Sequence, residues 1–413
     1  MSRTHAVVRG ALLLGAIGVA AGCGDGGDVI APAPNDPLFS SYVALGNSIT
    51  AGYQSAGIND STQKQSYAVL LAKQMNTRFA YPSLVSPGCP PPIANLLTGA
   101  RVGGATSTAS TCLLRAPASV SATINNVAVP GIATIDPISV GGTPGAQNSN
   151  PLVQLILGGE TMVQKALDNH PTFATVWIGN NDILAPALGG FPAGATPVTT
   201  FTSNYSKDIN ALVAGAPGIK GVLIGVVQVA GAPLLFQAGL IQASPLVAGA
   251  AAQVAGRPVA LDPATCAGAN AGALINFQAL GAIRSRPAAA PGTIFCQKVA
   301  GGGQNDPGDN GVLDIAEQAS VTATINAYNA YIKAKADSIG FAYYDPNPAL
   351  AALHSSGAIP PFPNLASTTA PFGQYFSLDG VHPAAAAHVV IANELIALIN
   401  ATYKTSLNPI AAQ

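Results

Sequence analysis

The sequence predicts an α/β fold in which helices cover both faces of a mostly parallel central sheet. Short apolar runs of strand length alternate with longer segments whose apolar residues recur at helical spacing. A serine follows the first of these strands, whereas an aspartate and a histidine precede the last helix of the 413-residue chain. If the serine reacts together with the aspartate and histidine, the two ends of the chain must meet, so we expect one domain rather than two.

Each strand and helix is expected from its own residue pattern. The run 40–46 is apolar, β-rich and ends at a glycine, and the run 173–179 has the same character. The segment 66–75 has apolar residues at helical spacing. The full set of expected strands is 40–46, 173–179, 220–227 and 341–344. The expected helices are 66–75, 151–169, 200–213, 317–339 and 383–402.

Two regions break this alternation. Residues from about 80 to 125 are rich in Pro, Ser, Thr and Gly, and residues from about 230 to 310 are rich in Ala, Gly and Pro with almost no charge. We expect both to be insertions into a single domain of residues 39–405. The second insertion is either a cap over a site or a packed excursion, because it combines short apolar runs with helix-breaking residues.

Ser48 lies just past the strand 40–46, at the carboxyl edge of the sheet, where open α/β folds bind ligands. A serine hydroxyl is a weak nucleophile unless a base lies beside it. The alternative is that Ser48 caps the next helix. Among the histidines, only His382 follows an aspartate, Asp379, by three residues. An aspartate at that spacing can orient the imidazole ring, so this pair is the candidate base and its partner.

Two further segments supply hydrogen-bond donors for a developing oxyanion. Asn181 follows the strand 173–179, so its side-chain amide should lie at the same sheet edge as Ser48. Gly131 follows Val-Ala-Val-Pro, and a glycine there lets the backbone turn sharply and offer its N–H. Each segment alone is ordinary turn chemistry. In this order along the chain, the four segments are typical of a serine ester hydrolase.

The four segments resemble the motif blocks of the GDSL/SGNH hydrolase family of esterases and lipases, and the resemblance spans nearly all of the chain after its leader. It implies an SGNH-type, flavodoxin-like three-layer sandwich with cap-like insertions and no cofactor. It also implies Ser48 as nucleophile, His382 as base and Asp379 as its orienting partner. The oxyanion hole would comprise the N–H groups of Ser48 and Gly131 and the side chain of Asn181.

The first block departs from the family at one position. Asn47 stands where the family name has Asp. Asn keeps the shape and the acceptor oxygen but loses the charge, and the residue is not part of the triad. We therefore expect tuned rather than lost activity. The chain has no Gly-x-Ser-x-Gly elbow, which argues against the α/β-hydrolase superfamily.

These observations predict an enzyme that cleaves carboxylic esters through an acyl-enzyme, with acyl-lipid or similar apolar esters as substrates. The apolar part of the second insertion should shelter the acyl chain. The residues expected to line that pocket are Leu234, Leu235, Phe236, Leu240 and Ile241. Two alternatives stay open: an esterase that removes O-acetyl groups from polysaccharide, and a non-catalytic surface binding protein on an SGNH scaffold.

The N-terminus is predicted to be a processed leader followed by a tether. Residues 1–22 combine basic residues with an apolar stretch too short to span a bilayer, and small residues precede Cys23. This resembles a bacterial lipoprotein signal peptide with Cys23 as the acylated residue; the alternative is an ordinary secretory leader. Residues 23–38 are rich in Gly, Ala and Pro and should be flexible. The leader and Cys23 predict an exported, lipid-anchored protein. Because no Asp follows Cys23 directly, the resemblance to lipoproteins implies the outer rather than the inner membrane.

Four cysteines remain after Cys23, and an even number in an exported chain suggests disulfides. Four cysteines allow three pairings. We expect Cys89–Cys112 and Cys266–Cys296, because each bridge would then staple one of the two insertions.

The composition argues against several other functions. Charged residues make up 8% of the chain, against about 25% in typical domains. The net charge of −1 gives no electrostatic basis for binding nucleic acid. No cluster of His and Cys has metal-ligand spacing. Residues 305–311 with Asp314 hold enough oxygens to suggest calcium, but they lack EF-hand spacing, and a turn leading into the next helix is favoured.

Overall fold

The computed structural model describes residues 33–96, 98–104, 115–116, 123–138, 151–285, 287, 292–297 and 311–411. The predicted signal peptide, the acylated Cys23, most of the tether and Cys112 lie outside these residues. The lipoprotein anchor and the Cys89–Cys112 bridge therefore stay predictions. The proposed calcium segment also lies mostly outside, but its described end, Asp314, caps the next helix by accepting the N–H of Glu317 at 2.8 Å.

The central sheet contains four parallel strands. They run in the order β1-β2-β3-β9, and all three pairings are parallel. All residues of β1 and β2 are buried, which explains why both read as apolar runs without alternation. The strands are β1 (Tyr42–Gly46), β2 (Phe173–Trp177), β3 (Lys220–Ile224) and β9 (Ala342–Tyr344). Each lies within one of the four predicted runs, apart from small differences at the ends.

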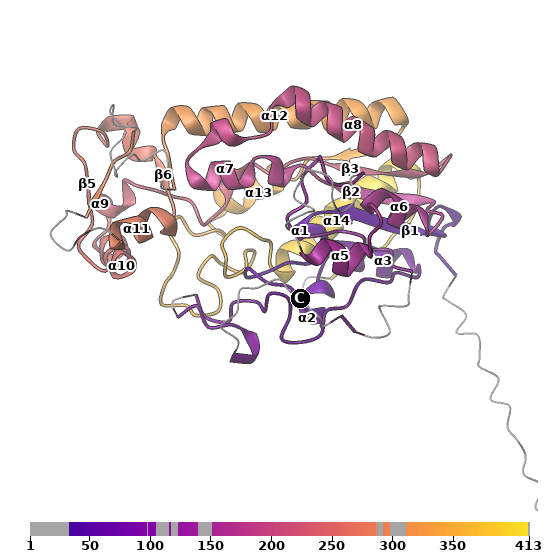
Figure 1. Cartoon of the computed structure of the whole chain (residues 1–413), viewed down its shortest axis with the longest axis horizontal. Coiled ribbons are helices and arrows are strands. Elements are labelled where there is room, and N and C mark those ends of the chain that lie inside the picture. Colours follow the sequence, from indigo (N-terminus) through magenta and orange to yellow (C-terminus); the bar gives the residue numbers. More distant parts are fainter. Residues whose placement is uncertain are drawn as a thin grey trace, which may run out of the picture.

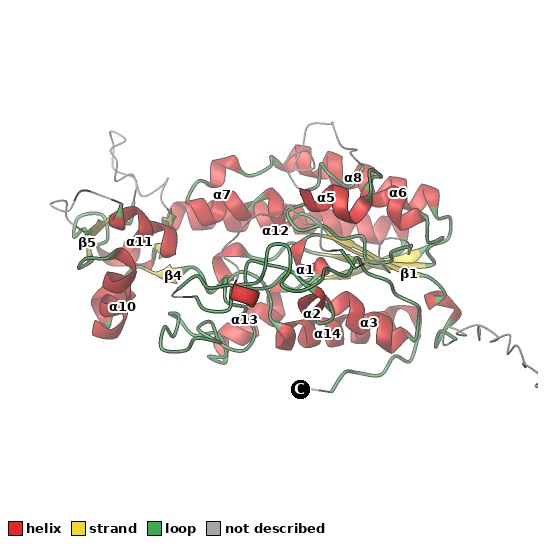
Figure 2. Ribbon diagram, turned by 60° about the horizontal axis from the view of Figure 1, so that its bottom comes forward, coloured by secondary structure: helices red, strands yellow, loops and turns green. Residues whose placement is uncertain are grey.

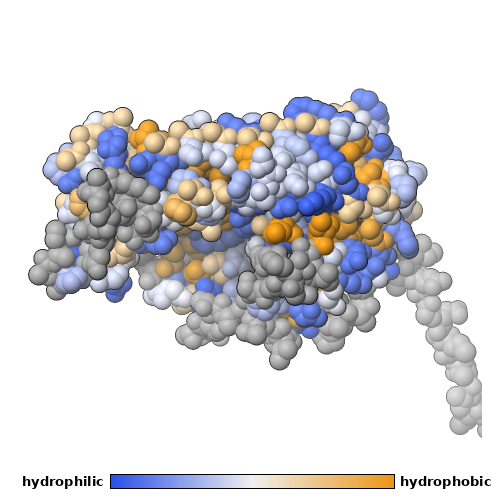
Figure 3. Space-filling model, turned by 45° about the horizontal axis from the view of Figure 1, so that its top comes forward, coloured by the Kyte–Doolittle hydropathy of each residue, from blue (hydrophilic) through white to orange (hydrophobic). Residues whose placement is uncertain are grey.

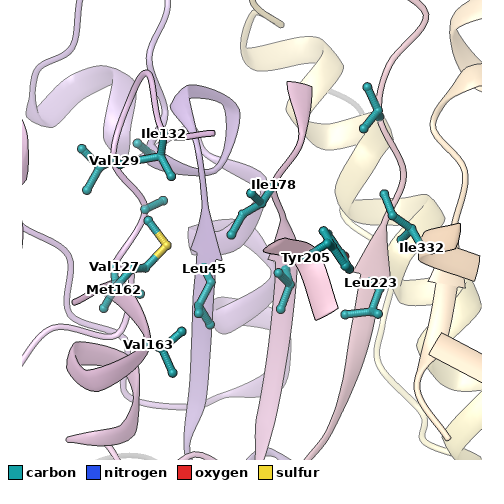
Figure 4. Close-up of a cluster of buried hydrophobic side chains, with 14 of the residues drawn as sticks. Leu45, Val127, Val129, Ile132, Met162, Val163, Ile178, Tyr205, Leu223 and Ile332 are labelled. Carbon is teal, nitrogen blue, oxygen red and sulfur yellow. The ribbon is translucent and has the colours of Figure 1, made fainter. Parts of the chain in front are cut away.

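Helices cover both faces of this sheet and form the predicted three-layer sandwich (Figures 1 and 2). One face packs against α5 (Pro151–Leu157), α6 (Met162–Leu167), α8 (Val198–Gly215) and α12 (Ile315–Ile339). The other face packs against α3 (Tyr67–Met75) and α14 (Ala385–Tyr403). Figure 4 shows part of the first core, in which Leu45 of β1, Leu223 of β3 and Ile178, just after β2, meet side chains of the covering helices. The helical periodicities in the sequence therefore mark faces that bury apolar surface against the sheet.

The segment 151–169 differs from the prediction, because it forms two helices instead of one. Gly158 and Gly159 have φ values of 65° and 95°, which end α5. Thr161 then starts α6, accepting the N–H of Gln164 while the Gln164 side chain accepts the N–H of Thr161. The glycine pair and the capping box are both visible in the sequence, and together they override the apolar pattern that continues across them.

The remaining elements are short. Around the sheet they are α1 (Ser48–Ala51), α2 (Asp60–Gln63), α7 (Leu184–Gly189) and α13 (Asn347–Ser355). In the second insertion they are β4 (Phe236–Gln237), α9 (Leu240–Ala243), α10 (Pro245–Ala255), β5 (Ala260–Leu261), β6 (Leu274–Ile275), α11 (Phe277–Arg284), β7 (Thr293–Ile294) and β8 (Val312–Leu313).

The second insertion folds into a small lobe, the described part of residues 236–313, at one end of the molecule (Figure 1). Its strands form an antiparallel β4-β6-β8 sheet and a separate β5–β7 pair. It has a buried apolar core of its own. The predicted Cys266–Cys296 disulfide is present and joins Cα atoms 4.9 Å apart across the β5–β7 region. The lobe is thus a packed unit stapled by one disulfide.

The described surface combines a low charge content with few exposed large apolar side chains. Among the described residues, Leu246 and Phe191 are the most exposed of these, at 81% and 50%. On the face drawn in Figure 3, hydrophilic and hydrophobic residues are interspersed. Uncharged polar groups therefore provide much of the hydration that charged side chains provide in typical domains.

Within the described ranges, α14 is the one helix long and apolar enough, by length and composition, to cross a bilayer. Its Ala392, Leu395 and Ile399 belong to the core that it shares with α3 and the sheet. These contacts account for its apolar composition as a helix of the sandwich.

His388 on α14 is a buried, uncharged histidine. Its Nδ1 accepts the backbone N–H of Tyr67 at 3.2 Å, and its Nε2 has no hydrogen-bond partner among the described residues. Burial, with a smaller contribution from the charge of His382, lowers the pKa of His388 to about 3. The ring is therefore a structural acceptor, in agreement with the absence of any aspartate at the spacing seen for His382.

Replacing this histidine should reduce the loss of stability in acid. The folded pKa is about 3 and the ordinary value is 6.5, so between these pH values the unfolded chain binds more protons and stability falls as the pH falls. His388→Asn keeps an acceptor for the Tyr67 N–H but cannot be protonated. Between pH 7 and pH 4, the free energy of unfolding should fall by about 3 kcal/mol more in the wild type than in the variant. Urea unfolding at both pH values tests this, and equal losses would contradict it.

Candidate active site

Strand β1 delivers Ser48 to the carboxyl edge of the sheet. The helix cap at this point is Asn47, whose Oδ1 accepts the Ile49 N–H at 3.2 Å. Ser48 is the first residue of α1 and is only 7% exposed. Because Asn47 caps the helix, the Ser48 hydroxyl is not used for that purpose. The side-chain nitrogen of Asn47, which an Asp would not have, is buried, and this Nδ2 has no hydrogen-bond partner among the described residues.

Ser48, His382 and Asp379 form a continuous chain of hydrogen bonds. The distance from Ser48 Oγ to His382 Nε2 is 2.9 Å, and that from His382 Nδ1 to Asp379 Oδ2 is 2.8 Å. The ring of Tyr53 packs on the imidazole, with its centroid 4.9 Å away. In the neutral imidazole that donates from Nδ1 to Asp379, Nε2 is an acceptor for the serine hydroxyl. This is the arrangement that general-base activation of a serine requires.

The Asp379 carboxylate accepts several hydrogen bonds besides that of His382 Nδ1. Oδ2 accepts the Ala56 N–H at 2.7 Å, and Oδ1 accepts the backbone N–H groups of Val381 and His382 at 2.9 and 2.8 Å. Burial alone would raise the pKa of this carboxyl, but the charge of His382 and the hydrogen bonds from His382 and Ala56 outweigh burial and lower it far below its usual range. Asp379 is therefore ionised whenever the protein is folded near neutral pH.

The segment before Gly131 runs along the free edge of β1. Asn125 O accepts the Ala44 N–H at 2.9 Å, and the Val129 N–H donates to Gly46 O at 3.1 Å. Because this pairing is parallel, the segment ends at the same sheet edge as β1 and places Gly131 close to the site. Gly131 has a φ of 87°, a conformation that favours glycine.

The η4 turn (Asn180–Asp182) after β2 holds the Gly131 segment from the other side. The Asn181 side chain donates from Nδ2 to Ile132 O at 2.8 Å. Asp182 accepts the N–H of Thr134 at 2.9 Å and its hydroxyl at 2.7 Å. Burial raises the pKa of Asp182, although these hydrogen bonds act in the opposite direction. Asn181 and Asp182 thus both bond the loop that carries Gly131.

Three donors are available at this edge. Among the described residues, neither the Ser48 N–H nor the Gly131 N–H has an acceptor within the protein. Asn181 uses one of its two amide hydrogens on Ile132 O, which leaves the other available. The structure thus joins Ser48, His382 and Asp379 by hydrogen bonds and places Asn181 on the same cavity as Ser48. Gly131 is the neighbour of Ile132, which Asn181 contacts.

A cavity of about 110 Å³ opens beside Ser48 and His382. Its walls are almost entirely apolar, and they come from the loop after β3, from α13 and from the first turns of α14. The lining residues other than Ser48 and His382 are Ile49, Trp177, Asn180, Asn181, Leu184, Val227, Gln228, Val229, Ala232, Tyr344, Pro346, Ala349, Leu350, Leu353, Phe376, Val381, Pro383, Ala387, Val390 and Ile391.

The predicted acyl-pocket residues do not line this cavity, so that prediction is wrong for it. Leu235 belongs to the core on one face of the sheet, and Phe236 and Ile241 belong to the core of the small lobe. Phe236 packs edge-on against Phe362 at 4.8 Å. The other two predicted residues, Leu234 and Leu240, are absent from the lining as well. The lobe needs Phe236 and Ile241 for its own core, because a unit of this size must bury such side chains to fold.

Sequence reasoning missed the α13 wall. Leu350 and Leu353 lie one turn apart on this helix, and the pattern is preceded by Pro346 and Pro348, which are common at helix starts. The helical pattern was therefore visible in the sequence, but it spans only the nine residues of α13. Within the described ranges there is no group of three or more His, Cys, Asp or Glu side chains that could hold a metal ion.

The model of the GDSL-like lipase/acylhydrolase family matches residues 42–395 of the chain. The protein belongs to this family. It is therefore a carboxylic ester hydrolase with the GDSL fold. No curated protein matches the chain.

Two kinds of solved structure are similar to this GDSL hydrolase. An extracellular lipase from Streptomyces rimosus is 14% identical, with a TM-score of 0.34, and the alignment covers 87% of this chain and 98% of the lipase. A family two carbohydrate esterase from Clostridium thermocellum, in complex with cellohexaose, is 13% identical with a TM-score of 0.34. That alignment covers 89% of this chain and 66% of the esterase. An active-site mutant of the same kind of esterase gives a TM-score of 0.35 at 13% identity, covering 90% of this chain and 66% of that one.

Removing the Asn181 amide should slow turnover strongly. Loss of one oxyanion donor costs about 10²–10³ in kcat in hydrolases of this chemistry, so Asn181→Ala should lose that much with little change in KM. The exposed Asn210, whose amide contacts Ser206 on α8, provides a matched control as Asn210→Ala. Steady-state kinetics on a soluble ester would test this. A raised KM with unchanged kcat would instead place Asn181 in ground-state binding.

Proposed function

We propose that the protein hydrolyses esters of apolar acyl groups through an acyl-enzyme formed on Ser48. One observation carries this proposal: the hydrogen bonds from Ser48 Oγ to His382 Nε2 and from His382 Nδ1 to Asp379, of 2.9 and 2.8 Å, start at the mouth of an apolar cavity. A nucleophile, its base and a binding space for one part of the substrate are thus adjacent.

The proposed reaction has two halves. Ser48 Oγ attacks the carbonyl carbon while His382 Nε2 takes its proton, and the ionised Asp379 stabilises the resulting imidazolium. The oxyanion then accepts hydrogen bonds from the N–H groups of Ser48 and Gly131 and from the Asn181 side chain. When the C–O bond breaks, His382 gives its proton to the departing alcohol. Water attacks the acyl-enzyme with His382 again as base, and this step releases the acid and restores the serine.

The cavity supports an apolar acyl chain as the preferred substrate group. Its lining is dominated by aliphatic and aromatic side chains, and Ser48 and His382 form its reactive end. Each buried methylene contributes about 0.8 kcal/mol to binding. An acetyl group would leave most of this apolar surface uncovered, so the cavity favours longer acyl chains over polysaccharide O-acetyl groups.

Ser48→Ala tests the catalytic assignment. The variant should fold normally, lose all measurable turnover of p-nitrophenyl esters and fail to react with a fluorophosphonate probe, because within the described part of the chain Ser48 is the hydroxyl that bonds the His382 imidazole. Probe labelling of Ser48 in the wild type, located by mass spectrometry, gives the positive result. Activity within tenfold of wild type would overturn the assignment, and an unlabelled, inactive wild type would favour a binding protein on the same scaffold.

Filling the cavity from α13 should change acyl-chain preference. For the wild type we expect kcat/KM to rise from acetyl to about hexanoyl or octanoyl esters. Leu350→Trp should lower kcat/KM for octanoyl esters at least tenfold while changing acetyl-ester cleavage much less. Ala351→Trp is the matched control, because Ala351 is an exposed residue of the same helix and does not line the cavity. If acetyl esters are the best substrates and Leu350→Trp has no effect, a polysaccharide O-acetyl esterase becomes the better assignment.

A further inference from the structure

A tight hairpin shortly after Ser48 has an unusual backbone. Gln54 and Gly57 exchange two backbone hydrogen bonds, at 2.9 and 3.1 Å, and so close a two-residue hairpin. Its central residues, Ser55 and Ala56, have φ values of 55° and 50°. Such turns normally place Asn or Gly at these positions, because other residues are strained at positive φ. Strain of this kind persists only where the surrounding structure holds it, and it is common at functional sites.

The N–H groups of both central residues of this hairpin donate to the turn that carries Asp379, whereas their carbonyl oxygens accept from Ile93 and Arg101. The Ser55 N–H donates to Ser377 Oγ at 2.8 Å, and Ser55 Oγ accepts the Leu378 N–H at 3.1 Å. The Ala56 N–H donates at 2.7 Å to Asp379 Oδ2, the same oxygen that contacts His382 Nδ1. The two residues with positive φ, Ser55 and Ala56, are therefore the same two whose N–H groups donate to the Asp379 turn.

Ser377 connects the hairpin with the carboxylate. Its Oγ accepts from Ser55 and donates to Asp379 Oδ1 at 3.1 Å, and its N–H donates to His382 O at 2.9 Å. The residue is 7% exposed, so these bonds form with little competition from water. Both carboxylate oxygens thus have a donor outside the pair that Asp379 forms with His382.

We propose that Ser55, Ala56 and Ser377 form a clamp that positions the Asp379 carboxylate for catalysis. The backbone N–H groups of Val381 and His382 already donate to Oδ1. The clamp adds the Ser377 hydroxyl at Oδ1 and the Ala56 N–H at Oδ2, so that both oxygens are held and Oδ2 stays in line with His382 Nδ1. The clamp also connects Asp379 with the segment that carries the nucleophile. Tyr53, the residue before the hairpin, donates its N–H to Ser48 O at 2.9 Å. These are positioning residues, because they act on the reaction through Asp379.

A double-mutant cycle tests the clamp. The inference rests on the proposed function, so Ser48→Ala and Asp379→Asn are measured first, and both should impair turnover. Ser377→Ala should then lower kcat about 10- to 100-fold with KM nearly unchanged. In the Asp379→Asn background, the same substitution should change kcat less than twofold, because Ser377 acts through the carboxylate. Ser338→Ala is the control and should leave kcat unchanged, since among the described residues this exposed hydroxyl bonds Lys335 O of its own helix alone.

The outcomes separate the clamp from the proposed function. If Asp379→Asn impairs turnover but the loss from Ser377→Ala is equal in both backgrounds, or appears only in KM, the clamp is overturned and the proposed triad stands. If Asp379→Asn is as active as the wild type, both are overturned. Should Ser377→Ala fail to fold, as judged by circular dichroism, Ser55→Gly takes its place in the cycle. Glycine adopts the positive φ without strain and keeps the N–H, but it loses the hydroxyl that accepts from Leu378, and the same two outcomes decide.

Discussion

The hydrogen bond between His382 Nε2 and Ser48 Oγ joins residues 334 positions apart in the chain, and much of the architecture is needed to make it. A parallel sheet brings the carboxyl ends of all its strands to one edge. Strand β1 therefore ends at Gly46, two residues before Ser48, β2 ends just before the turn with Asn181, and the segment along the free edge of β1 ends near Gly131. One topological feature thus accounts for the convergence of segments that are distant in sequence.

The turn with Asp379 and His382 is not part of the sheet, so it has to be held by other elements. The hairpin at Ser55 and Ala56 contacts it on the side of the nucleophile. Just before the small lobe, the Leu234 N–H donates to Gly380 O at 2.9 Å. Phe372 packs so closely that a Cβ on Gly380 would lie 2.7 Å from its ring. The second insertion therefore contacts this turn through Leu234, whereas α13 and α14 line the cavity beside Ser48.

The strands and the main helices could be predicted from the sequence, because each has a local signal, and the same signals led to Ser48, His382 and Asp379, which hydrogen bonds join. Buried parallel strands are continuous apolar runs, and the polar residues that follow them mark the reactive edge. The acyl pocket had no such signal, since Phe236 and Ile241 are as apolar in a lobe core as they would be in a binding site. The positive φ values of Ser55 and Ala56 were equally invisible, because neither residue is one that usually adopts them.

Helix α13 combines a firm attachment with incomplete packing. None of its residues is fully buried. It is attached at its ends, where Asn347 accepts the Gln228 N–H at 2.7 Å and His354 Nε2 contacts Gly231 O at 2.7 Å. Apolar surface on the leucines that face the cavity thus remains uncovered, and covering it contributes about 25 cal/mol per Å². An apolar acyl chain would supply this missing packing, so substrate binding and the stability of this wall are coupled.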